Sequence, residues 1–573
     1  MPDGDMKKED RNTGSGSRSS LLRRSLQRLR PSWPELADYL TAVLAGLAGS
    51  FAFAPAEQSY LIFITLWVLF RLLYLPRKQA RKCWVLLGSL CFFTTFWIHL
   101  SMTEYSDVPM ILAVVVMILF ALYLSSYHAL AIFLCNRLFR GQLFIKNILA
   151  VPACFILADY AAGHILTGFP WVCLGYTQIG TVFGNLAPVT GVHGITLALL
   201  LVTGLTYHGL RVRHLWHVAA ALLLVSVTTV CGGTYTQPEK PVRAVLVQGN
   251  IMQQIKWDPA RAGEIFSTYY QLSRPYFLGE EKTDLLIWPE SALPDMENNI
   301  GDLIAKLDLM AQRQDFSFIT GLQTYQPQDQ AYYNSVLSVG VQDSPEDIYT
   351  FLSGNRYYKR HLVPFGEKVP FQEILRRYGS FFNMPMSSFS NGPDEQENIA
   401  AKGVRIASAI CYEVAFPDEM QENIHDTTTL LLTLSNDGWF GTYNPATAEY
   451  HVSAGPYQHA AIARMRAMEF QKPMIRATNN GLTAVYDADG TVLAELPFYQ
   501  QGVLTVSVTP RHGSTPFGIH GYSIVFSVIF GMLLIAGSHL LILMMTTTGR
   551  RRRIRERRLK RGRREHRDHL EAC

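Results

Sequence analysis

The chain has 573 residues, which is too long for one ordinary globular domain and predicts two or more structural units. It is 49% hydrophobic and 17% charged, more apolar and less charged than a typical soluble protein. The formal net charge of +5 is concentrated in basic runs at both ends; beside apolar stretches, such runs favour cytoplasmic flanks on anionic lipid over nucleic-acid binding.

Long apolar stretches follow one another from the N-terminal side, most of them near the length of about 20 residues that a membrane-spanning helix needs. The first begins too late for a cleaved signal peptide, and further stretches follow it, so we expect this segment to be retained. Eight stretches are predicted spans: 38–55, 58–75, 84–102, 109–135, 147–165, 189–209, 214–232 and 522–545.

The short loops between these stretches predict the orientation of the chain. Loops 76–82, 136–146 and 211–214 are basic, whereas the alternating loops carry little Lys or Arg. The positive-inside rule therefore places the basic loops and both termini in the cytoplasm.

These observations divide the chain into five parts. We expect a large extracytoplasmic domain between the seventh and eighth spans. The predicted parts are a basic cytoplasmic tail (1–36), a membrane domain of about seven helices (37–232), the extracytoplasmic domain (233–518), a C-terminal spanning helix (519–546) and an Arg-rich cytoplasmic tail (547–573).

Beyond residue 241 the pattern changes to short β-branched runs that alternate with polar helical stretches. Helices are predicted at 262–277 and around 298–314. Continuous apolar strands interleaved with helices indicate an α/β domain whose sheet is covered on its faces. The predicted β-rich segments are 242–251, 283–291, 316–325, 332–340, 404–413, 428–441, 472–490 and 502–509.

One cysteine stands apart from the others. Of the eight cysteines, six lie in or beside predicted spans and one is the last residue, so Cys411 is alone in the extracytoplasmic domain. An extracytoplasmic compartment favours disulfides, but Cys411 has no partner in its own domain. Two interpretations remain at this point, a buried inert thiol and a nucleophile.

The neighbouring motifs decide between them. A cysteine nucleophile needs a base for its proton and a donor for the oxyanion that forms on attack. Glu290 stands at the end of the apolar run "LLIWPE", where burial suits a carboxylate to act as a general base. Lys359 follows two tyrosines and could stabilise an oxyanion, and Glu367 could orient that lysine.

"IWPES", "YYKRHLVPFGE" and "AICYEVAFP", in this order, resemble the Glu–Lys–Cys signatures of the nitrilase superfamily, whose domain is a four-layer αββα sandwich. The chain resembles more closely the membrane-bound branch of that superfamily, the apolipoprotein N-acyltransferases. This likeness covers roughly residues 35–545 and includes the segments "FAFAP", "GFPWVCLGYTQ", "VQGNIMQQIKWDP", "LSNDGWFG" and "QHAAIARMRAMEFQKPMIRATNNG".

The resemblance implies a role for each matching position. Cys411 would be the nucleophile, Glu290 the general base and Lys359 part of the oxyanion site. The supporting residues would be Glu367, Tyr412 and Glu413 around the centre, and Trp257, which would help to hold the acyl donor.

The resemblance also implies the reaction and its partners. Cys411 would take an acyl chain from a membrane phospholipid as a thioester, and the α-amine of the N-terminal S-diacylglyceryl-cysteine of an apolipoprotein would then receive it. This is the final step of lipoprotein maturation in the bacterial inner membrane. The implied partners are the phospholipid, the diacylglyceryl apolipoprotein and the bilayer, without nucleic acid, and we expect a monomer.

We expect no cofactor and no metal, because "HVSAGPYQH" is too loosely spaced for a ligand set. Two alternatives remain open. A membrane-tethered nitrilase-type amidase for small molecules would use the same three residues but gives no reason for eight spans. A transporter or receptor is disfavoured by the small number of charges inside the spans.

Overall fold

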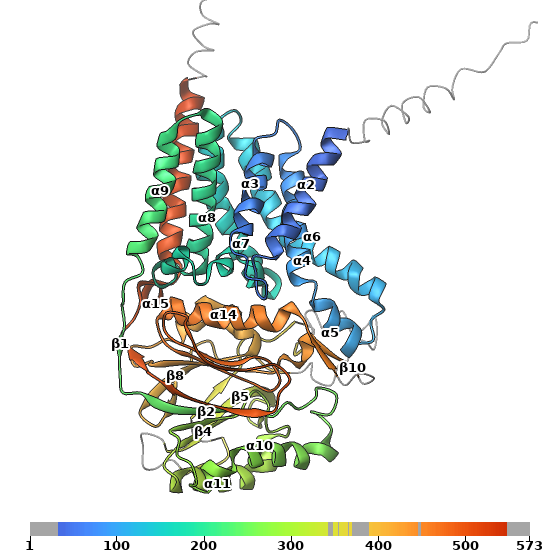
Figure 1. The fold of residues 1–573 in the computed structure, drawn as a ribbon, viewed down its shortest axis with the longest axis vertical. Coiled ribbons are helices and arrows are strands. Elements are labelled where there is room, and N and C mark those ends of the chain that lie inside the picture. The colour runs from blue at the N-terminus through green and yellow to red at the C-terminus, as the bar shows by residue number, and fades with distance from the viewer. Residues whose placement is uncertain are drawn as a thin grey trace, which may run out of the picture.

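The computed structural model describes residues 33–341, 348–352, 355–364, 366–368, 389–444 and 449–546. The predicted Arg-rich tail 547–573 and residues 1–32 of the predicted N-terminal tail lie outside the described residues. The described chain forms a bundle of helices that stands on an α/β domain (Figure 1).

Apolar helical segments build the bundle. Their long runs of Leu, Val, Ile and Ala favour helices that are apolar around most of their circumference. The bundle contains α2 (Trp33–Ser50), α3 (Leu61–Leu73), α4 (Gln79–Thr95), α6 (Met110–Leu138), α7 (Val151–His164), α8 (Ala187–Val212), α9 (Leu215–Val230) and the helix Ser523–Thr546.

The predicted count of eight spans is not confirmed. Among the described residues, four helices are long and apolar enough to cross a membrane, or five if one bent pair is a single span. The predicted span 84–102 is that pair: α4 and α5 (Ile98–Tyr105) meet at an angle of 51°. The bend has a physical cause, because Trp97 at the corner donates to Gln458 of the α/β domain at 3.0 Å, and α5 then packs beside that domain.

Two six-stranded sheets form the centre of the α/β domain. In each sheet the inner strands run parallel and the outer strands pair antiparallel. One sheet has the order β15 (Gly502–Val508), β2 (Val242–Gln248), β3 (Leu285–Ile287), β4 (Ser317–Gln326), β5 (Ala331–Gly340), β6 (Asn355–Tyr358). The other has the order β14 (Val492–Leu496), β13 (Thr483–Tyr486), β12 (Met474–Thr478), β9 (Leu430–Ser435), β8 (Val404–Ile410), β7 (Ile399–Ala401).

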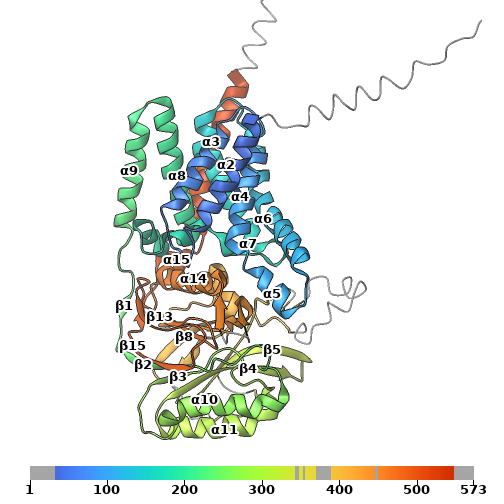
Figure 2. The same ribbon diagram turned by 45° about the vertical axis from the view of Figure 1, so that its right-hand side comes forward.

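Helices cover both outer faces, so the domain has four layers (Figure 2). The side chains between the two sheets form one apolar core, and α10 (Ala262–Phe277) with α11 (Glu297–Arg313) packs a second core on the far face of the β2–β6 sheet. Because both faces of the inner strands are buried, their sequences read as continuous apolar runs. The predicted helix 262–277 and the predicted hairpin of 316–325 with 332–340 are confirmed as α10 and β4–β5.

The outer layer on the other side is α14 (Ala454–Phe470), which lies between its sheet and the helical bundle (Figure 1). Side chains of α14, of the turn Cys411–Ala415 and of the bundle helices belong to one continuous apolar core. The same helix therefore completes the αββα sandwich and joins it to the apolar bundle.

Candidate active site

Cys411 begins a short 3₁₀ turn, Cys411–Ala415, directly after the buried strand β8. Its φ of 54° lies in the left-handed region that non-glycine residues rarely adopt. The residue is 8% exposed, and burial, with a further contribution from the Glu290 carboxylate, raises the pKa of the thiol to about 12. At neutral pH the group is a thiol, so attack on a carbonyl requires a base.

Glu290 supplies a carboxylate in the same interior. The strand β3 ends at Ile287, earlier than the end of the predicted strand 283–291. Glu290 therefore lies three residues beyond the strand rather than within it. Asn334 of β5 donates from Nδ2 to Glu290 Oε1 at 2.8 Å and to Glu367 Oε1 at 3.2 Å. One amide therefore holds both predicted carboxylates, a connection that strand periodicity could not indicate.

Lys359 follows β6 and is 1% exposed. Its Nζ lies 2.8 Å from Glu367 Oε2 and 3.7 Å from Glu290 Oε1. Although burial alone would lower the pKa of Lys359, the carboxylates of Glu367 and Glu290 raise it above its ordinary value. Lys359 is thus a permanent buried cation beside the Glu290 carboxylate, and its charge also favours the thiolate of Cys411.

Glu413 holds the turn that carries Cys411. Its Oε2 accepts from the Ile410 N–H at 2.6 Å, and its Oε1 accepts from the Arg360 N–H at 2.6 Å and the Tyr357 hydroxyl at 3.1 Å. Burial raises the pKa of Glu413 to about 7 despite these donors and the nearby Lys359. The carboxylate ties the Cys411 turn to the chain around Lys359.

Tyr412 points toward the helical bundle. Its hydroxyl donates to the main-chain carbonyl of Gly168 at 3.0 Å, and its ring stacks near those of Phe169 and Trp171. The loop that contains "GFPW" therefore contacts the residue next to Cys411.

Trp257 lies before the turn that leads into α10 and is partly buried. Its indole Nε1 has no hydrogen-bond partner among the described residues. The preceding residue is one that the sequence did not predict. Lys256 is 1% exposed and donates from Nζ to the main-chain carbonyl of Glu290 at 2.9 Å. The motif "KWDP" alone does not indicate this role for Lys256. The role becomes visible only once the structure shows that Lys256 contacts Glu290.

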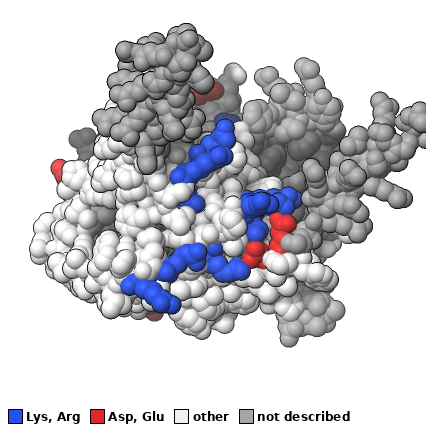
Figure 3. Space-filling view, turned by 90° about the horizontal axis from the view of Figure 1, so that it is seen from above, with Lys and Arg blue, Asp and Glu red and all other residues white. Residues whose placement is uncertain are grey.

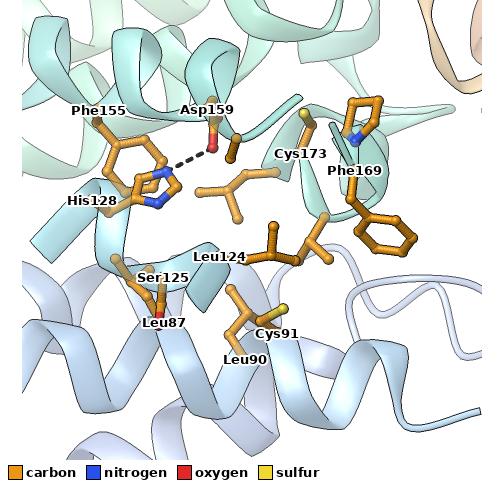
Figure 4. Close-up of a pocket in the computed structure, with 14 residues that line it drawn as sticks. Leu87, Leu90, Cys91, Leu124, Ser125, His128, Phe155, Asp159, Phe169 and Cys173 are labelled. Atoms are coloured by element: carbon orange, nitrogen blue, oxygen red, sulfur yellow. Dashed lines mark hydrogen bonds and ion pairs between the residues drawn. The ribbon is translucent and has the colours of Figure 1, made fainter. Parts of the chain in front are cut away.

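One buried group among the described residues has the atoms for a metal ion. Ligand atoms of Asp159, Cys173 and His193 lie within 4.8 Å of one another, and none of these residues belongs to the predicted site. Asp159 and Cys173 also line a small cavity of about 50 Å³ between bundle helices, where His128 Nε2 lies 2.7 Å from Asp159 Oδ1 (Figure 4). Asp159 therefore faces the interior of the bundle with a partner, as an acidic group in a membrane helix requires.

Two family models match the two parts of the chain. Residues 243–516 match a family model described as carbon-nitrogen hydrolase, so the α/β part is a domain of that class. Residues 45–205 match the model of the apolipoprotein N-acyltransferase N-terminal domain. A solved CN-hydrolase superfamily protein of Xanthomonas campestris aligns at 20% identity with a TM-score of 0.31, covering 47% of this chain and 91% of that one.

Curated relatives extend the match over most of the chain. The apolipoprotein N-acyltransferase of Vibrio cholerae is 40% identical over 492 residues, which are 84% of this chain and 93% of that protein. The one of Photobacterium profundum is 37% identical over 521 residues, which are 88% and 96% of the two chains. The chain belongs to the apolipoprotein N-acyltransferase family.

Proposed function

We propose that this protein is an acyltransferase that moves an acyl chain from a membrane phospholipid to the N-terminal amine of a diacylglyceryl apolipoprotein. The observation that carries the proposal is the position of the nucleophile: Cys411 stands beside buried Glu290 and Lys359, while the adjacent Tyr412 contacts the bundle at Gly168. A site between a hydrolase-type sandwich and an apolar bundle suits substrates that are anchored in lipid.

The first half-reaction loads the enzyme. Glu290 takes the proton of Cys411, the sulfur attacks the ester carbonyl of the phospholipid, and Lys359 stabilises the oxyanion. The ester C–O bond then breaks, the leaving oxygen takes the proton back from Glu290, and lysophospholipid departs. A thioester remains on Cys411.

The second half-reaction transfers the chain. The α-amine of the acceptor attacks the thioester carbonyl while Glu290 accepts a proton from the attacking nitrogen. The C–S bond breaks, the amide is released, and the proton returns to the sulfur of Cys411. Glu367 and Glu413 act by holding Lys359 and the Cys411 turn, and Trp257 is the proposed contact of the acyl donor.

A membrane-tethered amidase for small molecules is the alternative that the same three residues would permit. The match to relatives named apolipoprotein N-acyltransferase extends over the helical part as well as the α/β part. This match does not favour the amidase. One chain brings Glu290, Lys359 and Cys411 together, which supports action as a monomer.

The proposed topology keeps the five-part division and eight helical segments, with both termini in the cytoplasm of a bacterial inner membrane. Exposed Lys and Arg side chains gather at the end of the bundle far from the α/β domain, which supports this orientation (Figure 3). The exposed basic residues of the short loops are Arg77, Lys78, Arg81, Arg137, Arg140, Arg211 and Arg213.

Single cysteines introduced at exposed loop positions test the orientation. A membrane-impermeant thiol reagent applied to intact spheroplasts should label Asp107→Cys and spare Lys78→Cys and Arg213→Cys. Labelling of both Lys78→Cys and Arg213→Cys would show that the basic loops lie outside the cytoplasm, which is the opposite orientation.

Intact mass spectrometry tests the chemistry. The purified protein is incubated with phospholipid and no acceptor, with Cys411→Ala as the control. We expect a mass gain of one acyl chain on the wild type only, removable by hydroxylamine and transferable to a diacylglyceryl-cysteine peptide. If neither the adduct nor lysophospholipid forms, the acyltransferase is excluded, and release of ammonia from soluble amides would establish the amidase.

A further inference from the structure

A histidine of α14, the outer layer of the sandwich that faces the bundle, contacts the main chain of Cys411. His459 of α14 is fully buried, and its Nε2 lies 2.9 Å from the main-chain carbonyl oxygen of Cys411. A carbonyl oxygen only accepts hydrogen bonds, so Nε2 must carry a proton and donate it. None of the motifs around Cys411 contains this residue, which lies 48 positions further along the chain.

The other side of the imidazole is fixed by a buried ion pair. His459 Nδ1 lies 3.1 Å from Asp437 Oδ1 and 3.2 Å from Arg476 Nη2. Asp437 and Arg476 are themselves paired at 2.6 Å, and both are at most 1% exposed. Although burial would raise the pKa of Asp437, Arg476 and His459 hold it well below its usual range. Partners of this kind fix the orientation of a histidine ring in the way that outer partners orient metal-binding or catalytic histidines.

The imidazole ring of His459 also packs against Trp171, in the loop of the helical bundle that contains "GFPW". The ring centroid of Trp171 lies 5.5 Å from that of His459, and the Trp171 indole donates to Gln458, the residue before the histidine, at 2.8 Å. The imidazole is therefore confined on two sides, by the ion pair and by an aromatic residue of the bundle.

The bond to Cys411 matters because the main chain there is strained. A non-glycine residue in the left-handed region costs of order 1–3 kcal/mol and persists only where its surroundings hold it. Glu413 holds the Ala409–Ile410 peptide, one residue before Cys411, through the Ile410 N–H. His459 holds the carbonyl on the C-terminal side. The two bonds fix the main chain on both sides of Cys411, and the His459 bond is the one that holds a peptide group of Cys411 itself.

We propose that His459 is a positioning residue for the acyl-transfer reaction: its Nε2–H holds the Cys411 carbonyl so that the thiol points at Glu290 and the substrate carbonyl. The inference rests on the proposed thioester chemistry of Cys411. Without this bond the peptide that follows Cys411 can rotate and the sulfur moves with it; a misplacement of 1 Å can slow a reaction by about 10²-fold.

Two amide substitutions separate positioning from packing. In His459→Gln the side-chain amide nitrogen stands close to the place of Nε2 and can still donate to the Cys411 carbonyl. In His459→Asn the amide is one methylene shorter and reaches only the Asp437 side. Both replace a buried ring by an open amide, so a role in packing alone predicts similar damage from both.

The rate of acyl-enzyme formation is measured by quenched intact mass spectrometry over a range of phospholipid concentrations, for both variants and the wild type. We expect His459→Asn to lower the maximal rate by 10-fold or more with an unchanged half-saturating concentration, and His459→Gln to stay within about 3-fold. His425→Phe is the matched control, because His425 also contacts a main-chain carbonyl, that of Gln396, elsewhere in the domain. It should keep the wild-type rate.

The outcomes separate the two proposals. If the wild type forms no adduct, the proposed function fails. If the wild type forms it and His459→Asn is equally fast, or both amide variants are equally slow, only the role of His459 is overturned. Should His459→Asn not fold, His459→Gln alone decides, because a loss above 10-fold at the wild-type melting temperature contradicts the proposal.

Discussion

Lys256 and Glu290 are joined through the main chain: the buried ammonium of the lysine donates to the carbonyl oxygen of the glutamate at 2.9 Å. Glu290, the proposed base, therefore contacts two lysines: Lys256 at its main-chain carbonyl and Lys359 beside its carboxylate. Burial lowers the pKa of Lys256 to about 8, although Glu290 and Cys411 oppose the shift. This lysine changes its charge just above neutral pH, whereas Lys359 does not.

The depressed pKa of Lys256 makes stability depend on pH. The unfolded lysine titrates near 10.4, so between about pH 8 and 10.4 the unfolded chain binds the extra proton. The free energy of unfolding therefore gains a contribution that rises with pH across this window, by up to about 3 kcal/mol. We expect Lys256→Met to remove this rise, as measured by denaturant unfolding between pH 7.5 and 10.5.

Lys472 provides the matched control for this experiment. Burial lowers its pKa to about 8 as well, but its Nζ donates to main-chain carbonyls near the end of the domain, such as that of Gly513 at 2.9 Å. Lys472→Met should flatten the same stability profile and leave the pH dependence of acyl-enzyme formation unchanged. Lys256→Met should alter both. An unchanged stability slope in Lys256→Met would show that folding does not lower the pKa of Lys256.

The pKa of about 12 for Cys411 predicts a thiol that reacts slowly unless a base assists it. We expect Glu290→Gln to lower the rate of acyl-enzyme formation by about 10²- to 10⁴-fold, the usual contribution of a general base. Glu281→Gln, which alters an exposed ion pair with Arg243, should have no effect. Acylation of Glu290→Gln at the wild-type rate would assign the base to another residue.

The proposed acyl-transfer centre was predictable from the sequence to the extent that its residues lie in local motifs. Lys359 and Cys411 directly follow strands and Glu290 lies three residues beyond one, and the structure brings the three together. Lys256 and Asn334 were missed, because a lysine before a tryptophan and an asparagine within a strand have no distinctive spacing. Their positions become meaningful only when β2, β3, β4 and β5 lie side by side in one sheet, which brings both residues to Glu290.

Lys359 and Glu367 form a buried pair whose members should be costly to remove singly. Glu367→Gln is expected to lower the free energy of unfolding by about 3 kcal/mol, because it leaves a buried ammonium with less compensation. The double variant Lys359→Met, Glu367→Gln should be more stable than the sum of the two single losses. Chemical denaturation of the four proteins measures this coupling.

An exposed pair sets the scale for that measurement. Arg261 and Glu264 lie 2.9 Å apart on the surface, and Glu264→Gln should change the free energy of unfolding by less than about 1 kcal/mol. Additive losses at Lys359 and Glu367 would mean that the two side chains do not interact in solution.

Gln458 joins the bundle to the α/β domain through four hydrogen bonds. Its Oε1 accepts from the indoles of Trp97 and Trp171, and its Nε2 donates to the carbonyls of Ala54 and Thr94. Gln458→Leu leaves these buried groups unpaired, and we expect a loss of about 2–4 kcal/mol. Differential scanning fluorimetry in detergent should show a lower melting temperature.

Gln421→Leu serves as the comparison, because within the described part of the chain the Gln421 amide makes one bond, to the Gly518 carbonyl at 2.9 Å. It should shift the melting temperature much less. Equal shifts in both variants would show that the junction does not depend on Gln458.

The helical part was less predictable than the strands. Hydropathy located the apolar segments, but it treated 84–102 as one straight span, whereas the chain bends by 51° between α4 and α5. The bend is set by contacts from residues more than 300 positions away, such as the bond of the Ser101 hydroxyl to the Trp439 carbonyl at 2.9 Å. A local average of hydropathy contains no information about such partners.

The placement of α14 has a consequence for anyone who wishes to work with this enzyme in water. In a free-standing sandwich the outer helical layer would face solvent, but here α14 is almost entirely buried, and its Ile462, Met465 and Phe470 side chains pack into the same core as the bundle. Cutting the chain at the edges of the α/β domain would expose that surface and would also remove the Trp171 support beneath His459. An α/β domain that is soluble without detergent would require polar substitutions on the bundle-facing side of α14. Truncation of the chain alone would not be sufficient.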